Sequence, residues 1–189
     1  MANSSCRRHD ERARTAGSCR RQRVPAGLAF RPAKPWYGSM TRLPGSVLFL
    51  CGQNVIRSPI AEQLARAFLP RSIFIASAGI RPGERDPFVD AVLAERGLSL
   101  GNRQPQQLEE LEDAYFDLIV TLAPEAHHAA LELTRSAAVD VEYWPMPDPT
   151  TATGTREQIL DAYRDVALRL DRRIRERFSD GRALPAAST

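Results

Sequence analysis

Lysine, cysteine and long apolar runs are scarce in this sequence. The chain of 189 residues has one lysine, Lys34, among 26 basic residues, and it has three cysteines. No run of about eighteen apolar residues occurs, so the sequence predicts no membrane span. Cys6 and Cys19 lie in an arginine-rich N-terminal stretch and Cys51 alone lies beyond it, which excludes a disulfide framework and favours a reducing, cytoplasmic location. No spacing of cysteine and histidine suits zinc, and neither a metal nor another cofactor is expected.

The charge is divided unevenly along the chain. Residues 1–45 contain ten basic and two acidic residues, a net charge of +8, and the other 16 basic and 21 acidic residues give the rest of the chain a net charge of −5. A nucleic-acid-binding domain normally gathers its basic residues on the fold itself. The basic character here belongs to the N-terminal stretch, so the sequence gives no support to a nucleic-acid partner.

Residues 1–45 form an arginine-rich extension without sustained apolar periodicity, and we expect them to be disordered. Three interpretations stay open: a solvated tail, a transit peptide, or an upstream start codon with Met40 as the working start. Asp10 and Glu11 argue mildly against a transit peptide, and no apolar core of about 7 to 15 residues exists for secretion. We favour a dispensable tail, followed by one domain over residues 46–180 and a flexible tail over residues 181–189.

The stretch over residues 47–62 organises the rest of the chain. Four apolar residues predict a buried strand, a short polar loop begins at Cys51, and Ser58-Pro59 predicts a helix with serine as its N-cap and proline at its first position. A loop that runs from a strand into a helix N-terminus directs free backbone N–H groups and the positive end of the helix dipole into one small space. That field attracts phosphate and stabilises a thiolate, so Cys51 is a candidate nucleophile and Arg57 a candidate oxyanion clamp.

Predicted strands and helices alternate along the chain. Apolar runs predict strands over residues 47–50, 73–78, 116–122 and 139–143. Helical periodicity predicts helices from residue 58 to before Pro70, over residues 88–96 ending at Gly97, after Pro124, and from the capping box Thr155-x-x-Gln158 to Phe178. This order implies a parallel sheet with helices on both faces and a ligand site at the carboxyl ends of the strands, where Cys51 lies.

The spacing Cys-x5-Arg followed by Ser-Pro, after an apolar strand, resembles the signature of the low-molecular-weight protein tyrosine phosphatases. That family shares its superfamily with the thioredoxin-coupled arsenate reductases. Asp148-Pro149 stands at the position where the phosphatase family has its general acid. The resemblance covers residues 46–178. It implies an α/β fold, a three-layer sandwich with a central four-stranded parallel sheet in the order 2-1-3-4 and helices on both faces.

The resemblance also implies a cysteine-dependent phosphomonoesterase that acts on protein phosphotyrosine or on a small phosphomonoester. By this resemblance Cys51 is the nucleophile, Arg57 holds the phosphoryl oxygens, and Asp148 protonates the leaving group and then activates water. Ser58 donates to the thiolate in the family, and Asn54 is a residue type that tolerates a left-handed backbone. The phosphate-binding loop is predicted to consist of Gly52, Gln53, Asn54, Val55, Ile56, Arg57 and Ser58.

Each functional residue also has a plainer interpretation. Cys51 can be a small buried hydrophobe, Arg57 a surface ion-pairing residue, and Asp148 part of an ordinary Pro-Asp-Pro turn. The three residues together, in the family's positions, favour the catalytic interpretation. We expect the adjacent His127 and His128 to face solvent, and the acidic cluster over residues 109–113 to be a solvated helix face or loop.

Several positions depart from the family pattern. Ile56 stands where many members have a second cysteine, Thr150-Thr151 where eukaryotic members have two tyrosines, and Leu122-Ala123 where a Met-Asp pair is frequent. Arg81-Pro82-Gly83 occupies the loop where an aromatic residue often stacks on phosphotyrosine. Two alternatives stay open: an arsenate reductase that uses an external thiol, because no cysteine follows Cys51, and a non-catalytic phosphate-binding module.

Overall fold

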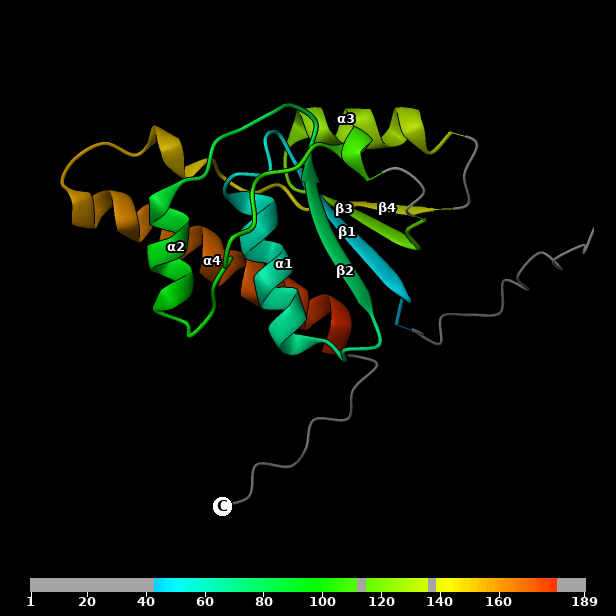
Figure 1. Cartoon of the computed structure of the whole chain (residues 1–189), viewed down its shortest axis with the longest axis horizontal. Coiled ribbons are helices and arrows are strands. Elements are labelled where there is room, and N and C mark those ends of the chain that lie inside the picture. Colours follow the sequence, from blue (N-terminus) through cyan, green and yellow to red (C-terminus); the bar gives the residue numbers. More distant parts are fainter. Residues whose placement is uncertain (1–42, 112–114, 136–138, 180–189) are drawn as a thin grey trace, which may run out of the picture. The chain divides into compact units, whose positions relative to one another are not determined.

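A four-stranded sheet forms the centre of the fold in the computed structural model, which describes residues 43–111, 115–135 and 139–179 (Figure 1). The strands are β1 (Ser46–Cys51), β2 (Phe74–Gly79), β3 (Leu118–Thr121) and β4 (Asp140–Tyr143). Neighbouring strands run parallel, and their order across the sheet is β2-β1-β3-β4. The predicted parallel sheet and its strand order are confirmed.

β1 is a central strand, and the predicted nucleophile is its last residue, at the carboxyl end of the sheet. Cys51, the last residue of β1, pairs with Gly79, the last residue of β2. On the other side, Leu50 pairs with Thr121 at the end of β3. Both neighbouring strands therefore end beside Cys51, at the carboxyl edge where parallel sheets bind their ligands.

Helices cover both faces of the sheet. α1 (Arg57–Phe68), α2 (Pro87–Ala94) and α4 (Arg156–Phe178) lie on one face, and α3 (Pro124–Leu133) lies on the other (Figure 1). Successive side chains of β1 enter two cores: Val47 and Phe49 pack with residues of α1 and α4, and Leu48 and Leu50 pack with residues of α3. A strand buried on both faces needs a continuous apolar run, which is why this stretch was predictable.

The start of α1 differs from the prediction. The helix begins at Arg57, so Ser58 and Pro59 occupy its second and third positions, and Ile56 stands at the N-cap without a capping side chain among the described residues. The Ser58 hydroxyl lies 3.0 Å from the Cys51 sulfur instead. The prediction of a serine N-cap followed by proline at the first helical position is therefore wrong, because the Ser58 hydroxyl contacts the Cys51 sulfur instead of capping the helix.

The other predicted elements are present and differ by one or two residues at their ends. α2 begins at Pro87, because Asp86 caps it by accepting a hydrogen bond at 2.8 Å from the N–H of the second helical residue. Gly97 follows this helix with φ at +69°, as expected of a glycine that ends a helix. α4 has the predicted capping box, with reciprocal hydrogen bonds between Thr155 and Gln158.

The residues directly before β1 contact the folded core. Leu43 packs against the core that contains α1 and α4, and the Gly45 carbonyl accepts a hydrogen bond from the Phe74 N–H at 2.9 Å. Residues 1–42 of the predicted extension and residues 180–189, which include the predicted C-terminal tail, lie outside the described residues. Among the helices of the described ranges, none is long and apolar enough to cross a membrane.

Candidate active site

Cys51 ends β1 with its side chain buried, at 2% exposure. Its Sγ lies 3.0 Å from Ser58 Oγ and accepts a hydrogen bond from the backbone N–H of Asn54 at 3.3 Å. Ser58 belongs to the first turn of α1, and Asn54 belongs to the loop that leads into it. The sulfur therefore lies at the N-terminal end of α1, where unpaired N–H groups and the helix dipole favour negative charge.

Asn54 shapes the loop between β1 and α1. Its φ is +57°, in the left-handed region that asparagine tolerates better than most residues. Its Nδ2 donates to Ser58 Oγ at 2.9 Å and to Ser77 Oγ at 2.8 Å, and its Oδ1 accepts from Gln106 N at 3.0 Å and from Arg103 Nη2 at 3.2 Å. These four bonds use the full hydrogen-bonding capacity of the amide, so Asn54 fixes the shape of the loop.

A buried carboxylate lies behind Ser77. Glu62 of α1 is 1% exposed, and its Oε2 accepts a hydrogen bond from Ser77 Oγ at 2.8 Å and forms an ion pair with Arg103. Its Oε1 pairs with Arg66 at 2.8 Å. Burial lowers the pKa of Arg103, although the charge of Glu62 opposes that effect. These contacts extend the support of the loop from Asn54 into α1, and the sequence did not predict them.

Two glycines allow the loop to pack closely against the segment that follows β2. A Cβ at Gly79 would lie 2.5 Å from the carbonyl carbon of Gln53 and 2.7 Å from Asn54 N. A Cβ at Gly83 would overlap the Val55 side chain and lie 2.7 Å from the Gln53 carbonyl oxygen. Only glycine permits these approaches, so the segment 79–83 packs directly against the loop and restricts its conformation.

Arg57 and Asp148, which are 91 residues apart in the sequence, lie together beside this loop. Arg57 begins α1, and its Nη2 lies 3.4 Å from Asp148 Oδ2. Its Nη1 donates to the Met146 carbonyl at 3.4 Å. The Arg57 side chain is 13% exposed and that of Asp148 is 44% exposed, so the carboxylate lies nearer to solvent. The structure thus brings together the elements that carry all three predicted catalytic residues.

The Asp148 carboxylate is oriented by its own turn. Asp148 caps the 3-10 helix η2 (Pro149–Thr151), and its Oδ1 accepts hydrogen bonds from the Thr150 N–H at 3.0 Å and the Thr150 hydroxyl at 2.7 Å. Partial burial opposes ionisation, but the two hydrogen bonds from Thr150 and the charge of Arg57 together hold the pKa of Asp148 below its usual value. Without a ligand, this residue is a carboxylate paired with Arg57.

Tyr163 of α4 contacts Asp86, the residue that caps α2. The Tyr163 hydroxyl donates to Asp86 Oδ2 at 2.7 Å, and the Tyr163 ring lies 5.3 Å from that of Phe88. Burial and the hydrogen bond to Asp86 raise the pKa of Tyr163 well above its ordinary value, and the charge of Asp148 adds to this. Neither Tyr163 nor Asp86 was predicted, although Asp-Pro before an apolar helical stretch is a usable N-cap signal.

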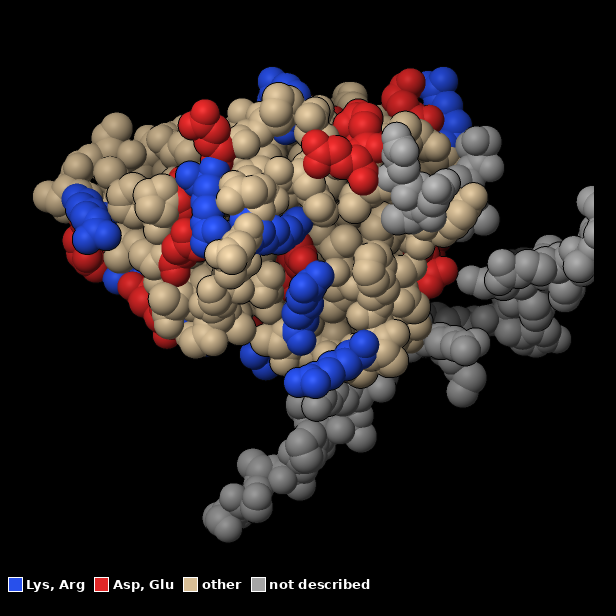
Figure 2. Space-filling view, viewed as in Figure 1, with Lys and Arg blue, Asp and Glu red and all other residues tan. Residues whose placement is uncertain are grey.

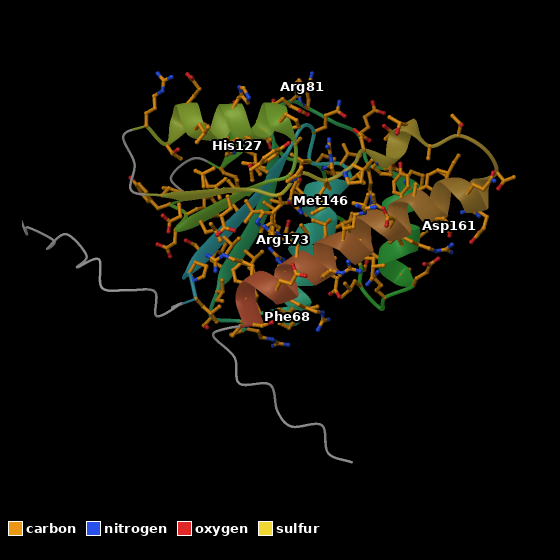
Figure 3. All side chains as sticks on the ribbon, turned by 180° about the vertical axis from the view of Figure 1, so that it is seen from behind. Phe68, Arg81, His127, Met146, Asp161 and Arg173 are labelled. Carbon is orange, nitrogen blue, oxygen red and sulfur yellow. The ribbon has the colours of Figure 1, made fainter. Side chains whose placement is uncertain are left out.

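The rim of the site is charged. A Cβ at Gly52 would lie 2.9 Å from Oε1 of Glu125 and 3.8 Å from Nη2 of Arg81, so these two side chains flank the residue after Cys51. Arg81 and Met146 lie toward the end of the sheet where β1 finishes (Figure 3). Residues 80–85, Ile-Arg-Pro-Gly-Glu-Arg, include no aromatic side chain.

The remaining predicted residues lie away from the Cys51 sulfur contacts. His128 is exposed as predicted, but His127 is partly buried: its Nδ1 lies 3.0 Å from Thr121 Oγ1 and its ring stacks on Tyr143 at 4.9 Å. The prediction that His127 faces solvent is therefore wrong, because the end of β4 covers it. Of the acidic cluster, Glu109 and Glu110 are exposed in the 3-10 helix η1 (Leu108–Glu110), and residues 112–113 lie outside the described residues.

Acidic and basic side chains are interspersed over the face shown in Figure 2. Many of these side chains form ion pairs, for example Arg85 with Asp90 and Arg164 with Glu95. Within the described ranges, no group of three or more histidine, cysteine, aspartate or glutamate residues is placed to hold a metal ion.

Known proteins resemble this chain over most of the described domain. The chain is 33% identical over 141 residues to Wzb, a low molecular weight protein-tyrosine-phosphatase of Salmonella typhi, covering 69% of this chain and 89% of that protein. It is 29% identical over 138 residues to an arsenate reductase of Bacillus subtilis (strain 168), covering 72% of this chain and 96% of that protein. The crystal structure of the tyrosine phosphatase AmsI of Erwinia amylovora matches with a TM-score of 0.60 at 24% identity, covering 76% of this chain and 96% of that one, which shows a shared fold.

The fold and the loop define the class: a parallel α/β sheet whose central strand ends in a cysteine, with an arginine at the start of the next helix. A family model described as low molecular weight phosphotyrosine protein phosphatase matches residues 46–178. The chain belongs to this family, as its resemblance at the sequence level predicted.

Proposed function

We propose that this protein hydrolyses phosphate monoesters through a phosphocysteine on Cys51. One observation carries the proposal: the Cys51 sulfur lies against Ser58 and the Asn54 N–H, at the N-terminus of α1, with the Arg57 side chain close to the same helix start. This arrangement offers backbone N–H groups and a guanidinium fork to a phosphoryl group directly above a nucleophile. Membership of a phosphatase family supports the same chemistry.

The first step transfers the phosphoryl group to sulfur. The Cys51 thiolate attacks phosphorus, forming the S–P bond while the bond between phosphorus and the leaving oxygen breaks. Arg57 and the loop N–H groups hold the other phosphoryl oxygens, and their positive charge stabilises the transition state. Asp148 gives its proton to the leaving oxygen.

The second step releases phosphate. Asp148, now a carboxylate, accepts a proton from water as the water oxygen attacks phosphorus and the S–P bond breaks. The sulfur leaves as a thiolate, and the hydrogen bonds from Asn54 and Ser58 stabilise it. Asp148 holds the proton taken from water until phosphate leaves, and it then releases that proton to solvent and returns to the carboxylate paired with Arg57.

Binding of substrate itself favours the protonated acid. In the free protein Arg57 lies 3.4 Å from Asp148 Oδ2 and favours the carboxylate. A bound phosphoryl group engages Arg57 and brings its own negative charge close to Asp148, and both changes favour protonation. The low pKa of the free residue is therefore compatible with its role as an acid in the complex.

Protein phosphotyrosine is the substrate that the family and the Wzb relative favour. Residues 80–85 include no aromatic side chain, and Arg81 and Glu125 give the rim its charge. Both features support recognition of the substrate through polar contacts rather than through stacking. The chemistry needs a free thiol, so we propose that the protein acts in the reducing cytoplasm.

Arsenate reduction is the second candidate, because relatives such as the one from Bacillus subtilis are named for it. Arsenate has the charge and shape of phosphate and fits the same loop. The sequence has no cysteine after Cys51, so a relay through further cysteines of the domain is absent and an external thiol has to reduce the Cys51 adduct.

Assays of the purified protein separate the two candidates. We expect hydrolysis of para-nitrophenyl phosphate and of a phosphotyrosyl peptide, no thiol-dependent arsenite formation, and loss of hydrolysis in Cys51→Ser with vanadate still bound. Arsenite formation without phosphatase activity would instead support the reductase. Hydrolysis by Cys51→Ser at the wild-type rate would contradict the phosphocysteine route.

A further inference from the structure

Two threonines follow Asp148-Pro149, and each bonds Asp148 in a different way. The Thr150 hydroxyl donates to the carboxylate, to Oδ1 at 2.7 Å, and the Thr150 N–H donates to the same oxygen at 3.0 Å. The Thr151 hydroxyl donates to the main-chain carbonyl of Asp148 at 2.9 Å. Only Thr150 therefore acts on the group that moves the proton.

We propose that Thr150 is a positioning residue for the acid: it occupies Oδ1 of Asp148 with two hydrogen bonds, so that the transferred proton is carried on Oδ2. This proposal rests on the proposed function, since it assumes that Asp148 is the general acid.

The geometry distinguishes the two carboxylate oxygens. Oδ1 accepts from both donors of Thr150, and a proton placed on it would oppose those donors. Oδ2 lies 3.4 Å from Arg57 Nη2 and has no contact with the turn among the described residues. Because Arg57 is the guanidinium offered to the phosphoryl group, Oδ2 is the oxygen that faces the reaction.

The hydroxyl of Thr150 also favours the charged form of Asp148, because a donor stabilises a carboxylate more than it stabilises a carboxylic acid. Other charged or titratable groups act on Asp148 from neighbouring elements. Arg57 of α1 favours the carboxylate, and the Tyr163 hydroxyl of α4 keeps its proton and donates a hydrogen bond to Asp86. These groups stay in place when the Thr150 hydroxyl is removed, so the change isolates one hydrogen bond.

The test is the pH dependence of kcat/KM for phenyl phosphate in the full chain. The basic limb of this profile reports the loss of the acid's proton in the free enzyme. Thr150→Val removes one donor to the carboxylate, so Asp148 keeps its proton to higher pH and the basic limb moves to higher pH. On that limb the variant should exceed wild type by roughly twofold to tenfold.

Three controls make the result specific. Thr150→Ser restores a hydroxyl and should return the limb to the wild-type position. Thr151→Val removes only the bond to the Asp148 carbonyl and should leave the limb unchanged. A substrate with a very acidic leaving group needs no proton in the first step, so its kcat/KM should not respond to Thr150→Val.

Coincident basic limbs in Thr150→Val and wild type would overturn the proposal, and so would an equal shift in Thr151→Val or no restoration by Thr150→Ser. Asp148→Asn, measured in parallel, separates this failure from failure of the proposed function. If Asp148→Asn lowers kcat/KM for phenyl phosphate while Thr150→Val changes nothing, only the positioning role falls. If Asp148→Asn has no effect on phenyl phosphate, the acid assignment falls as well.

Discussion

At the scale of single residues, Asp148 lies 3.4 Å from Arg57 and is the proposed general acid. How much the reaction depends on this acid is set by the basicity of the leaving group. A basic leaving oxygen departs only with a proton, whereas an acidic one departs without help. Asp148→Asn should therefore slow leaving-group release from phenyl phosphate by roughly 10² to 10⁴-fold, and release from a dinitrophenyl phosphate far less. Single-turnover measurements of the released phenol test this, because they exclude the later hydrolysis step.

The asparagine at this position still accepts from Thr150, so the turn should be retained. An equal loss with both leaving groups would return Asp148 to the role of an ordinary turn residue. The acid would then have to come from another side chain at the rim, and Glu125, which flanks Gly52, is a candidate.

Asn54 is the residue whose loss should most disturb the loop. Asn54→Ala removes the hydrogen bonds that the amide makes to buried partners such as Ser77, and it places a side chain without an amide at φ of +57°. We expect the free energy of unfolding to fall by about 2 to 4 kcal/mol and vanadate to bind more weakly. Urea unfolding and vanadate titration measure the two effects.

Asn54→Gly is the matched control, because glycine accepts the left-handed backbone but lacks the amide. It should be less destabilised than the alanine variant while losing the same hydrogen bonds. If Asn54→Ala unfolds at the wild-type urea concentration, the bonds of Asn54 do not hold the loop.

At the scale of elements, the end of β2 should control the shape of the loop through Gly79. A methyl group at this position would meet the backbone of Gln53 at 2.5 Å, so the loop or the strand has to move. We expect Gly79→Ala to lower the free energy of unfolding by about 1 to 3 kcal/mol and to weaken vanadate binding. Calorimetry of both variant and wild type, with and without vanadate, checks this.

Gly101→Ala is the control, because it should lower the free energy of unfolding by a comparable amount at a position away from the loop. Gly101 has φ of +58° and open space around its Cβ position, so the substitution should cost about 1 to 2 kcal/mol through the backbone alone. Vanadate affinity should stay at the wild-type value. A similar loss of vanadate affinity in both variants would show that general destabilisation, and not the contact with Gln53, weakens the loop.

The elements were predictable where their signals are local. The apolar run of β1, the glycine at position 97 and the capping box at Thr155 each depend on neighbours within a few residues, and each is confirmed. Ser58 shows the limit of such signals. A serine before proline is typical of an N-cap, but here the same hydroxyl contacts the Cys51 sulfur, which no local pattern reveals.

The unpredicted parts of the site are contacts between distant segments. Glu62 meets Arg103 across 41 residues, and Tyr163 meets Asp86 across 77 residues. Sequence spacing does not encode such pairs, because they depend on how the loops after β2 fold back on α1 and α4. Arg57 was predicted from its place at the start of the helix after Cys51, whereas Asp148, 91 residues away, was predicted only because the family has its general acid at that position.

At the scale of the whole molecule, the charge division predicts that the basic extension is dispensable. Deletion of residues 1–39 should leave the melting temperature and kcat/KM for para-nitrophenyl phosphate nearly unchanged, since the net charge of +8 lies within residues 1–45 and the domain follows. Thermal unfolding and steady-state kinetics of the truncated chain measure both. Aggregation or loss of activity would show that the extension belongs to the folded domain.

Deletion of residues 1–45 is the matched comparison. It removes Leu43 from the core and the two backbone hydrogen bonds of Gly45, to Phe74 and to the Asp117 carboxylate. We expect this longer deletion to lower the free energy of unfolding by about 1 to 3 kcal/mol. Equal stability of the two truncations would show that residues 43–45 add nothing to the fold.

The central claim is that the phosphoryl group passes through sulfur, and the intermediate itself can be trapped. Asp148→Asn with a dinitrophenyl phosphate should form the S–P bond readily and hydrolyse it slowly, because the first step needs no acid and the second lacks its base. We predict that the rapidly quenched protein gains the mass of one phosphoryl group, located on Cys51 by peptide mass spectrometry, and that Cys51→Ser shows no such turnover-competent adduct. A phosphoryl group on another residue, or continued turnover with no phosphoryl group on the protein, would contradict the account.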